Sequence, residues 1–345
     1  MAKKEKKQVC SRLGAVGGQA VLEGIMMRSK NRYTTAVRKL DTGEIVRSSS
    51  EVKSVSDKHK WMKLPLVRGV VNFIDTMKLS YSTLTFSAEA QGMDEEPETK
   101  FEKWLVEKFG EKLMAVVALI GTVLGLGVAV VLFMWLPKFL SDLVFPVAVS
   151  RFLNALMQGV LRIFIFVSYI ALVSLMKDMR RTFEYHGAEH KSIFCYEAGE
   201  PLTVENIRKK SRFHPRCGTS FFFVMMLLGI LLSVFLNFIP LPEGGLSNVL
   251  YTLMKLLTLP IVVGVGYEII RFAGRHDNAF VRLLTAPGLW MQRLTTREPD
   301  DAQIEVAIVA LKSALCEEFG EEQVFEGIAQ PQKPAEETSA EAQDA

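Results

Sequence analysis

The sequence predicts a mainly α-helical polytopic membrane protein with about four transmembrane helices, a small N-terminal unit containing a β-hairpin, and a cytoplasmic C-terminal helix. Hydrophobic residues make up 49% of its 345 positions, and charge is concentrated outside long apolar runs. Each of four runs approaches the roughly 20 apolar residues that cross a bilayer as a helix. These runs are 113–136, 153–176, 221–241 and 249–273, so we assign residues 113–273 to a membrane domain.

Lysine and arginine counts in the connections predict the orientation of these spans. The connection 177–220 carries nine such residues, 137–152 carries two and 242–248 carries none. Basic loops stay in the cytoplasm, and an even number of spans then places both termini there. We therefore expect a multi-pass protein of the cell membrane, in contact with membrane lipid.

Composition also indicates the redox state of the cysteines and which partners to expect. The four cysteines form no C-x-x-C pair, and free thiols are expected in the reducing cytosol. Basic clusters that flank apolar spans act as topology determinants, so no nucleic-acid partner is expected. The sequence leaves the oligomeric state open, a homo-oligomer included.

The segments outside the spans divide by composition. They are a basic N-terminal tail (1–13), a strand-rich cytoplasmic unit (14–62), an amphipathic helix with a charged linker (63–112), a cytoplasmic C-terminal segment with a helix (274–326) and a disordered tail (327–345). The basic tail lacks a following apolar core, so it is not a secretory signal peptide.

Local patterns predict the elements of these units. Alternating runs at 33–40 and 45–52 flank turn residues and predict a hairpin. In the segment 17–28, paired glycines precede a lone acid, Glu23, and a plain turn into one strand is the favoured interpretation. The amphipathic helix lies on the membrane interface or, as we favour, packs against the spanning bundle.

The C-terminal segment begins irregularly and then becomes helical. Residues 287–290 read Pro-Gly-Leu-Trp, which is typical of irregular structure. Asp300 and Gln303 have the spacing of a capping box, so we expect a helix from there to about Phe319.

An H-x-x-E-H pattern formed by His186, Glu189 and His190 lies just beyond the second apolar run. Two histidines four residues apart share one face of a helix, so both imidazoles can reach a single ion. The spacing is that of inverted zincins, in which the glutamate is the general base. The pattern predicts a divalent metal ion, zinc, at a membrane surface.

A third protein ligand is needed, with a fourth position left for water if the site is catalytic. If the second span continued as one helix, His186 would lie about 15 Å beyond the membrane. His276 follows the fourth span at a similar depth and is our preferred third ligand. The other candidates are His214, Glu184, Cys217 and Asp277, and two ligands from this set would instead close a structural site.

An open site predicts hydrolysis near the membrane surface, with a membrane protein or a lipid as substrate and a peptidase among the candidate enzymes. Glu189 or Glu184 would accept the proton of a metal-activated water, and Arg216 or Arg275 would stabilise developing negative charge. Glu23 is a further candidate acid.

Ionisable residues inside the apolar runs support a different class of function. Arg162, Lys255 and Glu268 lie within predicted spans, where such residues are functional candidates by default. We expect Arg162 to pair with Glu268 or with a backbone carbonyl. The alternative protein is a non-enzymatic transporter or assembly factor, with a structural metal site or none.

Five longer segments of the chain together carry a resemblance to a known family. They are GGQAVLEGIMMR, PLVRGVVNFIDTMK, EYHGAEHKSIFCYE, HPRCGTSF and PGLWMQRLTTREPDDAQIEVAI. With these segments the chain resembles the YqhQ-like family of bacterial membrane proteins of unknown function, which have been labelled predicted metal-dependent enzymes. The resemblance runs from about residue 14 to residue 314 and implies an integral membrane protein, compatible with metal at His186 and His190.

Overall fold

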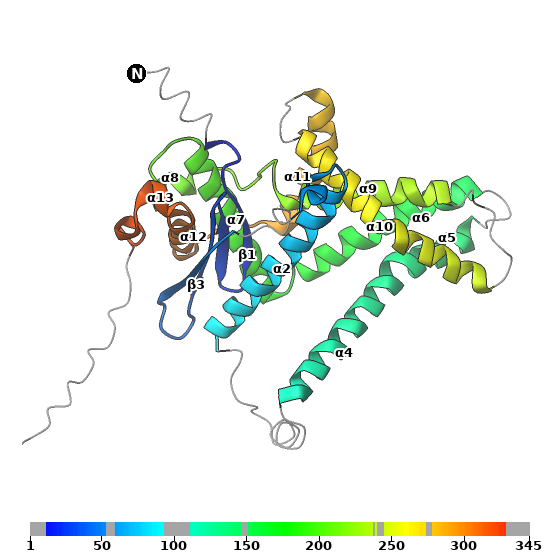
Figure 1. Ribbon diagram of the computed structural model, residues 1–345, viewed down its shortest axis with the longest axis horizontal. Coiled ribbons are helices and arrows are strands. Elements are labelled where there is room, and N and C mark those ends of the chain that lie inside the picture. Colours follow the sequence, from blue (N-terminus) through cyan, green and yellow to red (C-terminus); the bar gives the residue numbers. More distant parts are fainter. Residues whose placement is uncertain are drawn as a thin grey trace, which may run out of the picture.

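The computed structural model describes residues 12–52, 59–92, 111–145, 151–236, 239, 245–273 and 278–328. A unit built around a β-sheet lies at one end of the molecule, and an elongated bundle of apolar helices lies at the other (Figure 1). Helix α2 (Val67–Ala90) lies between them and contacts both the sheet and the bundle.

The sheet has four antiparallel strands in the order β1-β2-β3-β4. The strands are β1 (Gly17–Val21), β2 (Gly24–Arg28), β3 (Arg32–Arg38) and β4 (Ile45–Glu51). The predicted hairpin is confirmed as β3–β4. The favoured interpretation of residues 17–28 as a turn into one strand is wrong, because they form a second hairpin whose tight turn holds Glu23 at φ 49°.

Two helices cover the sheet and enclose its core. They are α7 (Lys177–Glu197) and α12 (Asp301–Ala314), with the short helices α8 (Val204–Arg208), α13 (Cys316–Phe319) and η4 (Glu321–Gln323) beside them. Ile25, Tyr185 and Ile304 from three elements are at most 1% exposed. The predicted capping box of Asp300 and Gln303 is confirmed at the start of α12.

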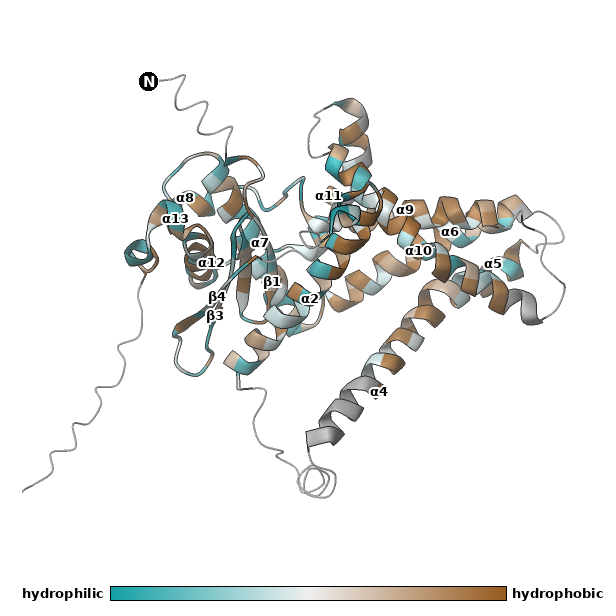
Figure 2. Ribbon diagram, in the orientation of Figure 1, coloured by the Kyte–Doolittle hydropathy of each residue, from teal (hydrophilic) through white to brown (hydrophobic). Residues whose placement is uncertain are grey.

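Among the described residues the bundle contains three helices long and apolar enough to cross a membrane: Ile120–Val144, Phe152–Val173 and Val249–Ala273. The third predicted span, 221–241, gives a shorter apolar stretch, Phe221–Leu236. The helices are α4 (Glu111–Val130), the π-helix η3 (Val131–Trp135), α5 (Leu136–Val144), α6 (Arg151–Val173), α9 (Gly218–Leu236) and α10 (Gly245–Ala273). Figure 2 shows hydrophobic residues concentrated along α4, α6, α9 and α10.

The second span does not continue into the histidine helix, contrary to our prediction. Helix α6 ends at Val173, and α7 begins only at Lys177, after Met176 in an extended conformation. The Ser174 hydroxyl donates to the carbonyl of Ala171 at 2.7 Å, so it stabilises the end of the first helix. The depth of His186 calculated for one straight helix therefore does not apply.

The segment predicted as irregular at 287–290 is also helical, since α11 (Ala279–Thr295) runs through Pro287. Packing against α9 compensates for the missing proline donor, with Val281 and Met291 of α11 buried.

Helix α2 packs against α10, as expected. A Cβ atom at Gly69 would lie 2.8 Å from the Cβ of Tyr267 and 3.0 Å from the Cα of Gly264, so these helices meet at backbone distance. Arg68 donates to Glu268 at 2.6 Å in the same interface. Glu268 is therefore not the partner of Arg162. Arg162 instead donates to the carbonyl of Phe133 at 2.9 Å, which confirms the alternative partner.

Candidate metal centre

Three potential ligand side chains meet where α7 passes the loop that leads into α9. His186 and His190 lie one turn apart on α7, and Cys217 directly precedes α9. Their ligand atoms all lie within 4.8 Å of one another, and His186 Nε2 is 3.2 Å from Cys217 Sγ. In a tetrahedral zinc site neighbouring ligand atoms are roughly 3.3–3.6 Å apart, so small side-chain rotations suffice to close the set around an ion.

Backbone carbonyls fix the orientation of both imidazoles. The Nδ1 of His186 lies 2.8 Å from the carbonyl of Thr295, and the Nδ1 of His190 lies 2.5 Å from that of Arg212. A carbonyl only accepts, so each Nδ1 carries the proton and each Nε2 is left with its lone pair. Metal-binding histidines use their other ring nitrogen in the same way.

The imidazole of His190 is buried, and its Nε2 has no hydrogen-bond partner among the described residues. Burial lowers the pKa of His190 below its ordinary value, which favours the neutral imidazole that metals require. A buried nitrogen without a partner is costly in a folded protein unless a ligand satisfies it.

Close packing positions the ligand helix. A Cβ atom at Gly187 would overlap the carbonyl oxygen of Arg297, so only glycine lets α7 approach the segment between α11 and α12 this closely. In the same place the Arg297 N–H donates to the carbonyl of Phe183 at 2.8 Å. Gln292 holds the loop before α9, because its side chain bonds both the N–H and the carbonyl of His214 at 2.8 Å.

An open cavity of about 780 Å³ adjoins the centre. The start of the sheet, α7 and the loop before α9 enclose it, and its lining includes Gly18, Arg28, Lys30, Glu189, His190 and Cys217. A Cβ atom at Gly18 would lie 2.8 Å from Glu189 Oε1, so the glycine allows β1 to pass close to this carboxyl group. The cavity therefore brings the ligands and one buried acid to the same space.

Glu189 is a buried carboxyl group with the properties of a proton acceptor. It is 5% exposed, and burial raises its pKa to about 7, with partial opposition from His186 and the Gly18 N–H. A carboxyl group with this pKa exchanges protons readily at neutral pH. It does not belong to the His186–His190–Cys217 ligand set.

A second buried acid, Glu197, contacts three residues that line the cavity. It pairs with Arg216, accepts from the Gly14 N–H at 2.9 Å and lies 3.7 Å from His214 Nε2. Burial alone would raise the pKa of Glu197, but His214, Gly14 and Arg216 together lower it to about 2. His214 is thus part of the cavity wall and stands outside the set of three ligands.

This depressed pKa predicts a pH-dependent stability. A carboxyl group whose pKa falls on folding contributes stability above its unfolded pKa, and the contribution is lost as pH falls from about 4.5 towards 2. We expect Glu197 to contribute about 3 kcal/mol at neutral pH, since one pKa unit is worth about 1.4 kcal/mol.

Urea unfolding at pH 6 and pH 3 measures this contribution. Glu197→Gln should destabilise the protein at pH 6 and show a weaker loss of stability on acidification than the wild type. Glu205→Gln, at an exposed carboxyl group of α8, is the control. Equal pH dependence in the Glu197→Gln variant and the wild type would refute the assignment.

Other predicted site residues lie apart from the ligand set. Glu184 accepts from Gln303 at 3.1 Å and so connects α7 to α12. Glu23, which lies in the β1–β2 turn, accepts a hydrogen bond from Arg181 at 2.5 Å. The candidates Arg275, His276 and Asp277 lie outside the described residues. Cys217, ranked behind two histidines from the sequence, is the side chain with a potential ligand atom that the described residues bring to the pair.

The fold and the site define a class of protein: mainly helical, with three membrane-length helices joined to a small sheet-containing unit that carries a His-His-Cys cluster. Residues 64–317 match the family model described as "Protein of unknown function (DUF1385)", and the chain belongs to this family. It is 33% identical over 307 residues to the "Uncharacterized protein YqhQ" of Bacillus subtilis (strain 168). These aligned residues cover 87% of this chain and 92% of that protein. The resemblance to YqhQ-like proteins is thereby confirmed. No solved structure matches the chain.

Proposed function

We propose that this protein is a metal-dependent hydrolase of the cytoplasmic membrane face, with zinc held by His186, His190 and Cys217. The strongest support is the buried Nε2 of His190, which has no hydrogen-bond partner among the described residues and belongs to a set of three ligand side chains. Two imidazole nitrogens and one thiolate suit zinc.

Three protein ligands favour a catalytic centre over a structural one, because the fourth position stays open. His214 is a side chain that could close the coordination sphere, but it lies outside the set of three ligand atoms. Its ring centroid lies 5.5 Å from that of His190, and its backbone is clamped by Gln292. The adjoining cavity provides the space that a substrate needs.

The chemistry is hydrolysis. Zinc bound here supplies Lewis acidity and a water whose pKa is lowered to about 7. Glu189 accepts the proton of the attacking water and returns it to the leaving group. Its burial and raised pKa make both transfers feasible near neutral pH.

Basic side chains in the cavity favour substrates that carry a negative charge. Arg28 and Lys30 line it and make no ion pair with another described residue, whereas the charge of Arg216 is offset by Glu197. An acyl or phosphoryl substrate with an anionic group fits this lining.

The position of the cluster favours a substrate from the membrane. Cys217 directly precedes α9, so the centre lies at the end of the apolar bundle. The basic connection 177–220, which carries all three ligands, favours the cytoplasmic side. If the shorter stretch Phe221–Leu236 also crosses the membrane, the number of spans is even and both termini lie on that side as well. A membrane protein or a lipid can present a scissile bond at this depth.

Hydrolysis of p-nitrophenyl acetate by the purified protein in detergent tests the proposal. We expect zinc-dependent turnover that a chelator abolishes and added zinc restores. Glu189→Gln should lower the rate about 10²–10⁴-fold at unchanged zinc content, the usual effect of losing a general base. Glu184→Gln, off the cluster, is the matched control and should keep the rate. Wild-type turnover in Glu189→Gln would overturn the assigned role.

A non-enzymatic membrane protein remains the second candidate, supported by cations in the apolar bundle. Lys138, Arg162 and Lys255 all lie in membrane-length helices. If the cluster is purely structural, the wild type should bind zinc without zinc-dependent turnover, and Glu189→Gln should be tolerated.

A further inference from the structure

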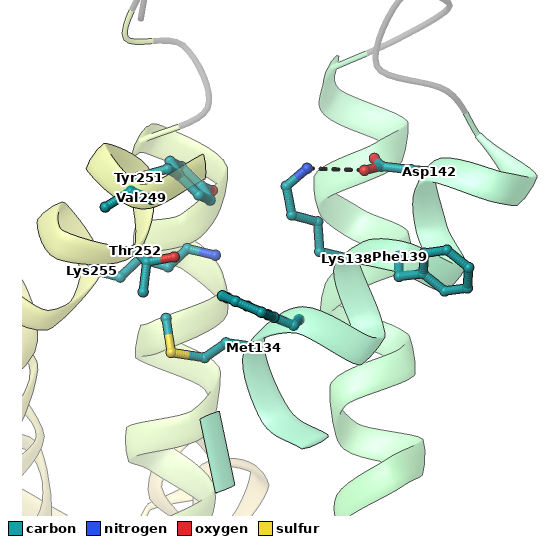
Figure 3. Close-up of a pocket in the computed structure, with 9 residues that line it drawn as sticks. Met134, Lys138, Phe139, Asp142, Val249, Tyr251, Thr252 and Lys255 are labelled. Carbon is teal, nitrogen blue, oxygen red and sulfur yellow. Dashed lines mark hydrogen bonds and ion pairs between the residues drawn. The ribbon is translucent and has the colours of Figure 1, made fainter. Parts of the chain in front are cut away.

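A second cavity lies within the bundle, at the end remote from the metal centre. Its volume is about 380 Å³, and η3, α5 and α10 supply its lining. Apolar walls come from Met134, Trp135 and Phe139, while Lys138 and Lys255 bring ammonium groups from facing helices (Figure 3).

Positive charge exceeds negative charge in this cavity. The single lining acid, Asp142, is already satisfied, because Lys138 donates to it at 2.9 Å and Asn154 donates to its other oxygen at 2.8 Å. The Lys255 ammonium lies 4.2 Å from the centre of the Tyr251 ring and forms no ion pair with another described residue. One cation is thus left for an external anion.

The two lysines lie at a matching depth. Each is six residues from the outer end of its apolar helix, which begins at Val249 or ends at Val144. At 1.5 Å per residue this is about 9 Å inside the end of the apolar stretch, a depth from which a lysine side chain can extend to the phospholipid headgroups.

The backbone at this place is irregular as well. The π-helix Val131–Trp135 interrupts the long helix beside the cavity. Such π-bulges occur frequently at functional sites. Tyr251 is fixed by a hydrogen bond from its hydroxyl to the carbonyl of Ser233 at 2.9 Å, so the surface under Lys255 is rigid.

We propose that this cavity binds an anionic amphiphile of the bilayer, with its headgroup on Lys255 and its acyl chain along Met134, Trp135 and Phe139. Basic pockets between transmembrane helices bind anionic lipid headgroups for the same reason. The shared chemistry is one negative head on an apolar chain, whether a phosphate diester or a carboxylate. This site is independent of the proposed hydrolase activity.

Fluorescence quenching of Trp135 tests the inference on the full chain. A variant with Trp61→Phe, Trp104→Phe and Trp290→Phe leaves Trp135 as the single tryptophan. It is reconstituted in phosphatidylcholine vesicles that contain a small fraction of a brominated probe. The probes are brominated phosphatidylglycerol, brominated phosphatidylcholine and dibromostearate.

We expect half-maximal quenching at a probe fraction about fivefold lower for an anionic probe than for brominated phosphatidylcholine, the enrichment that one facing lysine provides. A preference for phosphatidylglycerol identifies a phosphate head, and a preference for dibromostearate alone identifies a carboxylate. Equal quenching by all three probes would overturn the proposal.

Charge variants locate the effect. Lys255→Met should abolish the anionic preference, and Lys255→Arg should retain it. Lys78→Met removes one exposed charge from α2 and is the matched control. The proposal also fails if the preference survives in Lys255→Met, or if Lys78→Met loses it to the same extent.

Discussion

His190→Ala should lower the affinity of the protein for zinc about 100-fold. Structural zinc sites with four protein ligands bind with about 10–16 kcal/mol, so each ligand accounts for roughly 3 kcal/mol. A loss of 1.4 kcal/mol is tenfold in affinity. The remaining pair, His186 and Cys217, cannot replace a buried imidazole whose Nδ1 bond to the Arg212 carbonyl already orients its free Nε2.

Competition with a zinc-binding dye measures this change in purified protein. His59→Ala removes an exposed histidine outside the cluster and should leave the affinity unchanged. Melting curves of the metal-free proteins separate lost ligation from lost folding. Wild-type affinity in a folded His190→Ala protein would exclude this residue from the ligand set.

Gly187→Ala should destabilise the protein by about 3 kcal/mol, the upper range for overpacking a closed interior. The added methyl group meets the backbone oxygen of Arg297, which cannot rotate away as a side chain would. Relief requires α7 to move from the segment that joins α11 to α12. Thr295, the last residue of α11 directly before this segment, bonds His186, so zinc affinity should fall as well.

Gly229→Ala is the matched control, since this helical glycine of α9 has nothing within 4 Å of an added Cβ atom. Denaturant unfolding in detergent should leave Gly229→Ala near wild-type stability or slightly above it, because alanine favours helix. If Gly187→Ala unfolded at the same midpoint as this control, α7 would not pack as described.

Much of the fold could be predicted from local patterns. The β3–β4 hairpin follows from alternation around turn residues, and the capping box places the start of α12 within a residue. Where one helix ends and the next begins could not be predicted from local patterns. An apolar run followed by helix-favouring residues does not reveal the extended Met176 that separates α6 from α7, and Pro287 masks a helix that tertiary packing stabilises.

The candidate site was predicted in part. Spacing on one helix face placed His186 and His190 together, because that relation is local. Cys217 joins them through the contact of α7 with a distant loop, which no local pattern encodes. One signal was present in the sequence: Cys217 follows His214 by three residues directly before an apolar run. The need for glycine at positions 187 and 18 also arises from tertiary contacts. An added Cβ atom would meet the carbonyl group of Arg297 at Gly187 and the carboxyl group of Glu189 at Gly18.

X-ray absorption at the zinc edge of the protein purified from cells tests the metal centre most directly. We predict zinc with one sulfur neighbour at about 2.3 Å and nitrogen neighbours at about 2.0–2.1 Å. In Cys217→Ala the sulfur neighbour should disappear, while Cys316→Ala should keep it. Protein without zinc, or zinc surrounded by oxygen neighbours alone, would contradict a centre formed by His186, His190 and Cys217.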